Sequence, residues 1–144
     1  MTLKQISVFL ENKPGTLQQL TDVLAQNNIN MRALSLAETS EFGIVRIIVD
    51  EIGKAAEVLK AEEYIYTVTG VLGVAIPDEP GGLSRVLRVL SGGGVNVEYM
   101  YAFLGGKDMP HAYMIFHVQD AAAAVAALDE ACISCITQDD LNSL

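Results

Sequence analysis

Residues 9–31 are FLENKPGTLQQLTDVLAQNNINM, and residues 75–97 are AIPDEPGGLSRVLRVLSGGGVNV, the same pattern 66 positions later without a gap. Six matched positions are identical: Pro14/Pro80, Gly15/Gly81, Leu17/Leu83, Val23/Val89, Leu24/Leu90 and Asn30/Asn96. A repeat of this kind indicates that one small supersecondary unit is made twice. We therefore expect two coupled domains, residues 1–69 and 70–144.

Both copies have the same predicted order of elements. In the first, apolar residues alternate at positions 6, 8 and 10, which is typical of a strand with one buried face, and a turn follows at 12–15. Leucines and valine at helical spacing then predict an amphipathic helix that ends near residues 27–28. Strands at 30–37 and 44–49, a helix at 52–62 and a strand from residue 64 complete the copy.

The second copy repeats this order, with strands near 72–76, 95–104, 113–118 and 133–137. Its helices start near Leu83 and after Asp120, and Asp50 is the matching predicted cap in the first copy. The offset from Asp50 to Asp120 is 70, which places four extra residues in the hairpin around 105–110. The order strand, helix, strand, strand, helix, strand predicts an α+β fold, two ferredoxin-like βαββαβ units with antiparallel sheets.

The charge balance narrows the class of protein. Nine basic and 18 acidic residues give a net charge of −9, which disfavours nucleic acid and anionic membranes as partners. No apolar stretch is long enough to span a bilayer, and the first residues have no signal-peptide core. With two cysteines only, we expect a cytoplasmic protein with free thiols.

The repeated segments resemble the ACT domain, a small-molecule-sensing module of enzymes of amino-acid metabolism. The residues that carry the resemblance are LENKPGTL (10–17) and NINM (28–31), then IPDEPGGL (76–83) and GVNV (94–97). The resemblance covers nearly the whole chain. It implies that the two units pack side by side, with all helices on one face, and that an amino-acid effector binds at their seam.

Residue by residue, Asn12 matches the loop asparagine of ligand-binding ACT domains, and Asn30 matches the asparagine that begins the second strand. A helix N-terminus offers unpaired N–H groups to a carboxylate, and an asparagine amide can both accept and donate. In the second copy Asn96 is kept but Asp78 replaces the loop asparagine, so two unequal sites or a single site are expected. The predicted ligand-binding residues are Asn12, Pro14, Gly15, Thr16, Leu17, Asn30, Asp78, Gly81, Gly82, Leu83 and Asn96.

Two features keep alternatives open at these positions. Asn12 and Asp78 are also typical of turns that their side chains close, and Asn30 and Asn96 of chain entry into a strand. Some ACT domains carry a histidine two residues before the loop asparagine, whereas this chain has Leu10 and Ile76 there. The identity of the effector is therefore open.

Other residues could carry different chemistry. Cys132 and Cys135 form a Cys-x-x-Cys, for which we favour two buried structural cysteines over metal or redox use. His117, matched to Ile47 in the first copy, is predicted to be packed or hydrogen-bonded, and His111 to be solvated. The alternating aromatic residues Tyr99, Tyr101 and Phe103 indicate a packed sheet face first and an interface second.

The favoured function is a free-standing regulatory or sensor protein, without catalytic residues, metal or cofactor, that binds an amino acid between tandem ACT units. A homodimer and a metabolic-enzyme partner are the expected associations. The alternatives are an assembly subunit that has lost ligand binding and a metal or redox protein that uses Cys132 and Cys135.

Overall fold

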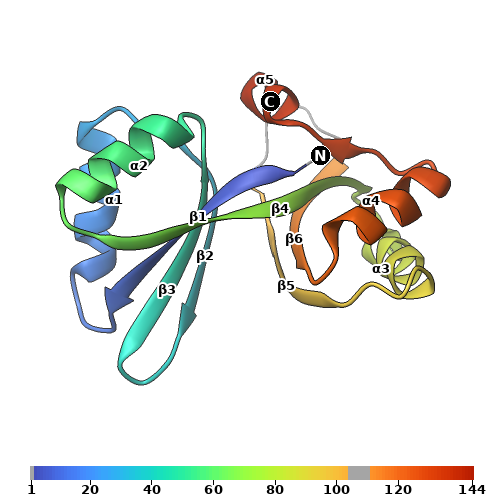
Figure 1. Cartoon of the computed structure of the whole chain (residues 1–144), viewed down its shortest axis with the longest axis horizontal. Helices are drawn as coiled ribbons and strands as arrows, with labels where there is room; N and C mark the ends of the chain where they lie inside the picture. The colour runs from blue at the N-terminus through green and yellow to red at the C-terminus, as the bar shows by residue number, and fades with distance from the viewer. Residues whose placement is uncertain (1, 104–110) are drawn as a thin grey trace. The chain divides into compact units, whose positions relative to one another are not determined.

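The computed structural model describes residues 2–103 and 111–144, which fall into two compact units (Figure 1). The first unit is Lys4–Thr69, and the second comprises Met1–Leu3 and Gly70–Leu144. The insertion predicted around residues 105–110 lies outside the described residues. In the part of the chain that is described, no helix combines the length and apolar character needed to cross a bilayer.

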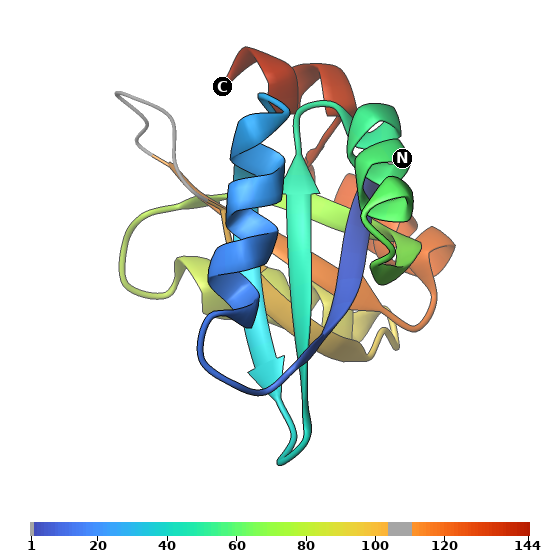
Figure 2. The same cartoon turned by 90° about the vertical axis from the view of Figure 1, so that its left-hand side faces the viewer.

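The first unit has a four-stranded antiparallel sheet. Along the chain, its elements are β1 (Leu3–Glu11), α1 (Thr16–Gln26), β2 (Met31–Glu38), β3 (Phe42–Val49), α2 (Ile52–Ala61) and the first part of β4 (Ile65–Pro77). The strand order is β2-β3-β1-β4, so β2 is an edge strand. Figure 2 shows α1 and α2 together over one face of this sheet.

The core of the first unit lies between this sheet face and the helices. Alternate residues of β1 (Ile6, Val8 and Leu10) point into it, and Leu20 and Leu24 of α1 cover them. An α-helix completes one turn in about 3.6 residues, so leucines four residues apart lie on the same face of α1. The periodicity seen in the sequence therefore corresponds to the buried stripe of α1.

The second unit has the same architecture. After the rest of β4 come α3 (Gly82–Gly92), β5 (Val97–Ala102), β6 (His111–Val118), α4 (Ala121–Glu130), β7 (Cys135–Ile136) and α5 (Gln138–Ser143). The strands pair in the order β5-β6-β4-β7, which repeats the order of the first unit. The prediction of an α+β fold with two ferredoxin-like βαββαβ units is confirmed.

The register of the middle hairpins corrects the predicted alignment of the copies. Ile6 pairs with Ile47 in the first unit, and Leu72, its repeat mate, pairs with Phe116. Beyond the hairpin the offset is therefore 69, and the second copy is longer by three residues rather than four. Phe116, not His117, takes the place of Ile47.

The same shift of one residue corrects a predicted helix cap. Asp120 caps α4 as predicted, since its Oδ1 accepts a hydrogen bond from the N–H of Ala123 at 3.0 Å. The matching residue before α2 is Glu51, whose side chain makes no cap. Asp50 instead accepts from the N–H of Asn30 at 3.1 Å, which ties the start of β2 to the end of β3.

Three features at the ends of elements differ from the sequence-based expectation. The strands predicted near residue 64 and at 72–76 are one continuous strand, β4, which belongs to both units. The last predicted strand shrinks to the two residues of β7. The chain then forms α5, which was not predicted and starts with a capping box between Thr137 and Asp140.

Candidate functional site

The loop between β1 and α1 is shaped by one glycine and one threonine. Gly15 precedes the helix with φ 90°, a left-handed conformation that glycine adopts without strain. The Thr16 hydroxyl donates to the carbonyl of Glu11 at 2.8 Å and to that of Lys13 at 3.0 Å. Both interactions fold the loop back over the end of β1.

The N-terminus of α1 has no side-chain cap. The amide of Gln19 donates to Gly15, but within the described residues the amides of Leu17 and Gln18 have no acceptor. Amides at the start of a helix carry a partial positive charge that favours an anion. This helix end can therefore receive a carboxylate.

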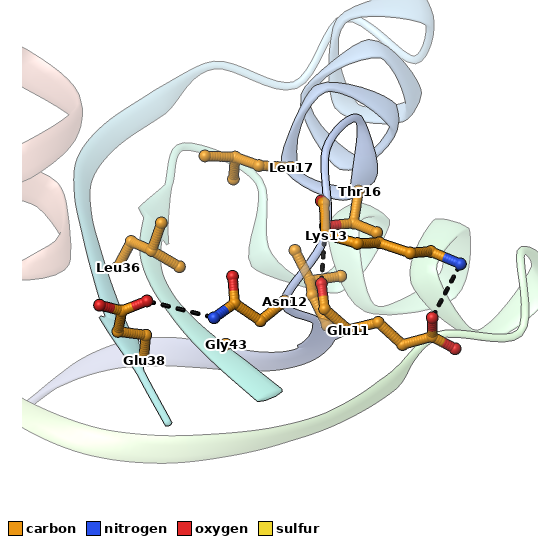
Figure 3. A pocket seen from close by; sticks show the side chains of 9 residues that line it. Glu11, Asn12, Lys13, Thr16, Leu17, Leu36, Glu38 and Gly43 are labelled. Carbon is orange, nitrogen blue, oxygen red and sulfur yellow. Dashed lines mark hydrogen bonds and ion pairs between the residues drawn. The ribbon is translucent and has the colours of Figure 1, made fainter. Parts of the chain in front are cut away.

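Asn12 connects the loop to the β2–β3 hairpin. Its Nδ2 donates to Glu38 Oε2 at 3.1 Å (Figure 3). The same Nδ2 donates to the carbonyl of Thr39 at 3.1 Å, and the backbone N–H of Asn12 donates to the carbonyl of Glu41 at 3.1 Å. A side-chain amide has two N–H donors, and both are used here. Both donors are thus used within the protein, its Oδ1 is left as an acceptor, and the role of Asn12 in ligand binding stays a prediction.

A pocket of about 400 Å³ lies between this loop and the hairpin. Three predicted residues, Asn12, Thr16 and Leu17, line it, whereas Pro14 and Gly15 shape the loop without lining the pocket. The lining residues that the sequence analysis missed are Leu10, Glu11, Lys13, Leu36, Glu38 and Gly43. Leu36, Glu38 and Gly43 come from the hairpin, which no local sequence signal connects to the loop.

Lys13 and Glu11 form an ion pair at the rim of the pocket. Lys13 Nζ lies 2.8 Å from Glu11 Oε2, with both side chains largely exposed. The hydrogen bond and the charge of Lys13 lower the pKa of Glu11, and Glu11 in turn raises the pKa of Lys13. Both residues also line a second hollow of about 390 Å³, whose apolar residues are Phe9, Leu10, Phe42, Tyr64 and Ile65.

Asn30 does not lie at this pocket. It precedes β2 and bonds to Asp50 at the end of β3, whereas Asn12 lies beside the start of β3. The two asparagines lie beside opposite ends of β3, whose eight residues span seven steps of about 3.3 Å, so roughly 23 Å or more separates them. Within one unit, the two predicted asparagines are therefore on opposite ends of the sheet.

The matching loop of the second unit has the same backbone but different side chains. Gly81 has φ 86° and α3 again starts without a side-chain cap. Gly82, in the place of Thr16, is buried, and a Cβ on it would lie 2.3 Å from the carbonyl oxygen of Pro77. Asp78 and Leu83 are exposed, and the backbone carbonyl of Asn96 accepts from the backbone N–H of Gln119 at 3.2 Å.

The cysteines and histidines do not form a cluster. Cys132 is exposed and Cys135 is buried, so the expectation of two buried cysteines holds for Cys135 only; burial raises the pKa of its thiol. The ring of His117 stacks on that of Tyr99, with ring centres 4.7 Å apart. The Nδ1 atom of His117 lies 3.4 Å from Glu98 Oε1 but makes no hydrogen bond. His111 is exposed. Over residues 2–103 and 111–144, no group of three or more histidine, cysteine and acidic residues could hold a metal ion.

Tyr99 and Tyr101 of β5 and Phe103, which directly follows β5, form a packed set, as their alternation predicts. Tyr101 and Phe103 are buried, and Tyr99 is half-buried against the His117 ring. Phe103 also contacts Tyr113 of β6, with ring centres 6.0 Å apart. These contacts explain the alternating aromatic residues as packing.

Comparison with known proteins gives a consistent result. The family model described as an ACT domain pair matches residues 1–144. A protein of Bacteroides thetaiotaomicron with a known crystal structure is 39% identical, with a TM-score of 0.92 over 100% of this chain and 98% of that chain. No match was found among curated proteins.

Two more distant crystal structures share the fold. The ligand-free regulatory subunit of aspartate kinase from Thermus thermophilus has 17% identity and a TM-score of 0.64, over 91% of this chain and 93% of that chain. The corresponding subunit from Thermus flavus has 13% identity and a TM-score of 0.61, over 92% and 94%. At these identities the likeness concerns the fold alone.

Proposed function

Because this chain belongs to the family of ACT domain pairs, we propose that it is a regulatory protein that binds an amino acid or a similar small molecule. The observation that carries the proposal is the pocket between the β1–α1 loop and the β2–β3 hairpin. It combines acceptors from Glu38 and Asn12 with the uncapped start of α1 and an apolar wall. An α-amino acid carries an ammonium group, a carboxylate and a side chain that match these three surfaces.

We further propose that the complete site needs two copies of the chain. Asn12 and Asn30 both belong to the first unit and lie at opposite ends of its sheet, so a ligand that contacts both must take them from two copies. The matched loop with Asp78, Gly81, Gly82, Leu83 and Asn96 is the candidate for a second, unequal site. Binding then regulates by favouring one arrangement of the units or one partner-bound state.

We propose no catalytic role for any residue of the chain, so ligand binding can regulate a reaction only through a partner protein. A metabolic enzyme is the expected partner and a homodimer the expected assembly. The edge strand β2 supports a homodimer, since it leaves Leu34 and Leu36 exposed at 36% and 54%. The dimer can be tested by light scattering of the protein and of Leu34→Lys, which should dissociate.

A thermal-shift screen against the common amino acids tests the proposal. A ligand at 100 times its Kd stabilises the protein by about 2.7 kcal/mol, or roughly 5–10 °C in Tm for a chain of this size. Asn12→Ala should abolish most of this shift, because the variant loses the pocket acceptor and releases the hairpin from the loop. Glu57→Ala, on the exposed face of α2 and outside both loops, is the control variant and should keep the shift.

The same screen separates the proposal from its main alternative, an assembly subunit that binds no ligand. The exposed leucines of β2 fit an assembly subunit as well as a sensor, because a second chain can cover them whether or not a ligand binds. A protein that is dimeric and shows no shift with any amino acid would be an assembly subunit.

A further inference from the structure

Glu38 is an acidic group in the pocket that lacks a basic partner. Its Oε2 accepts a hydrogen bond from Asn12, and among the described residues no lysine, arginine or histidine lies within ion-pair distance of it. The basic residue of the lining, Lys13, is already paired with Glu11 at 2.8 Å. Among the residues that the structure describes, the lining therefore has one negative charge without a basic partner.

The second polar group of the pocket is also an acceptor. One side-chain N–H of Asn12 donates to Glu38 (Figure 3) and the other to the Thr39 carbonyl, so only the Oδ1 of Asn12 is available to a ligand. A carboxylate and an amide oxygen together favour a group with several N–H donors and a positive charge. A primary ammonium group has both properties.

The remaining lining has three leucines, beside the paired Glu11 and Lys13 and the Thr16 hydroxyl, which donates to backbone carbonyls. Leu36 of β2 is 54% exposed, Leu17 of α1 is half-buried, and Leu10, the strand partner of Gly43, also lines the pocket. Covering Leu36 and Leu17 with hydrocarbon removes apolar surface from water, which favours binding in proportion to the area covered. A charged or strongly polar ligand side chain would lose hydration at these leucines without gaining a partner.

From these observations we propose that the pocket of the first unit selects aliphatic α-amino acids. Their ammonium group binds between the Glu38 carboxylate and Asn12 Oδ1, and their side chain packs against Leu17 and Leu36. The inference rests on the proposed function and adds the ligand class and the role of Glu38. In the repeat, the residue 66 positions after Glu38 is Leu104, outside the described residues, so the carboxylate is specific to the first copy.

Calorimetry on the full chain tests this with leucine, isoleucine and valine as probes. N-acetyl-leucine, which lacks the ammonium charge, and aspartate serve as comparison ligands. We expect the aliphatic amino acids to bind, aspartate to bind at least about tenfold more weakly, and N-acetyl-leucine not to bind. Glu38→Gln keeps an acceptor for Asn12 but removes the charge, so leucine should bind roughly 10- to 100-fold more weakly, the range for a hydrogen bond to a charged group.

Glu57→Gln is the matched control, because it removes the same charge from the exposed face of α2 and should leave the Kd within about twofold. The melting temperature of each free variant establishes that it is folded. Leucine binding that is unchanged in Glu38→Gln, or tighter binding of aspartate than of leucine, would overturn the proposal while leaving amino-acid sensing in place. Absence of heat with every amino acid would instead refute the proposed function and, with it, this inference.

Discussion

Replacing Gly82 by alanine should destabilise the second unit, because the start of α3 lies directly against the end of β4. A Cβ at this position would lie 2.3 Å from the carbonyl oxygen of Pro77 and 3.1 Å from Cγ2 of Ile76. Ordinary contacts of this kind are about 3.4–4 Å, so the loop or the strand must move by about 1 Å. Pro77 and Ile76 are paired with β6, which resists that movement.

The cost follows from this enforced displacement. Inserting a methyl group into a packed site typically costs about 1–3 kcal/mol, and the gain from replacing glycine in a helix, up to about 1 kcal/mol, offsets part of it. We expect a net loss of about 1–2 kcal/mol in the free energy of unfolding. For a chain of this size, that corresponds to a Tm lower by roughly 2–8 °C.

Urea unfolding followed by circular dichroism measures this loss, with Gly92→Ala as the control. Gly92 is the last residue of α3, and a Cβ there would have no atom within 4 Å. The control should therefore match the wild-type protein or exceed it by up to about 1 kcal/mol. If Gly82→Ala is as stable as Gly92→Ala, the second loop is not held against Pro77 and the stated difference between the two loops is wrong.

Three further predictions concern caps and thiols. Asp120→Ala should lower the free energy of unfolding by about 1 kcal/mol, whereas Glu51→Ala at the matching helix should change it little, because only Asp120 makes a side-chain cap; thermal melts of both variants compare them. Iodoacetamide should alkylate Cys132 in the native protein and spare Cys135, whose thiol is buried and has a raised pKa; equal labelling by mass spectrometry would contradict this. Hydrogen bonds from Thr137 lower the pKa of Asp140 below its ordinary 3.8, so the stability that Asp140 contributes should be present above that pH and be lost as the pH falls through its lower folded pKa. Proton titration by NMR checks the direction of this shift, and Asp140→Asn should flatten the corresponding pH dependence.

The repeat was enough to predict the fold, because it fixes which apolar positions face a common core. Leu17, Leu20 and Leu24 already show the stripe of α1, and the turn at Pro14-Gly15 shows where that helix begins. The register of the second hairpin was not predictable from the matched aspartates, Asp50 and Asp120. Both flank a helix, but only one caps it, since a one-residue shift separates the two roles.

The pocket was only half predictable for a physical reason. The loop that supplies Asn12, Thr16 and Leu17 is local, and its turn chemistry is visible in the sequence. Glu38 reaches Asn12 across 26 residues through the fold-back of the β2–β3 hairpin, and no local pattern predicts such a contact. By contrast, α5 was predictable in principle, because Thr137-x-x-Asp140 before Leu141 is a capping-box pattern.

The two copies of the repeat have similar backbones in the loop before the first helix but different side chains there. Left-handed residues recur at matched positions, as at Gly15 and Gly81, and both helices after these glycines start without a cap. Identical backbones would give two equal anion-binding helix ends, so the difference between the loops must come from side chains. The first loop has the neutral Asn12 and the basic Lys13. In the second loop the residues at these two positions are Asp78 and Glu79, which are both acidic. Two carboxylates before a helix end compete with a ligand carboxylate for the same partial charge, and they repel it. A site in the second copy equal to the proposed first site would therefore require changing this charge as well as replacing the buried Gly82.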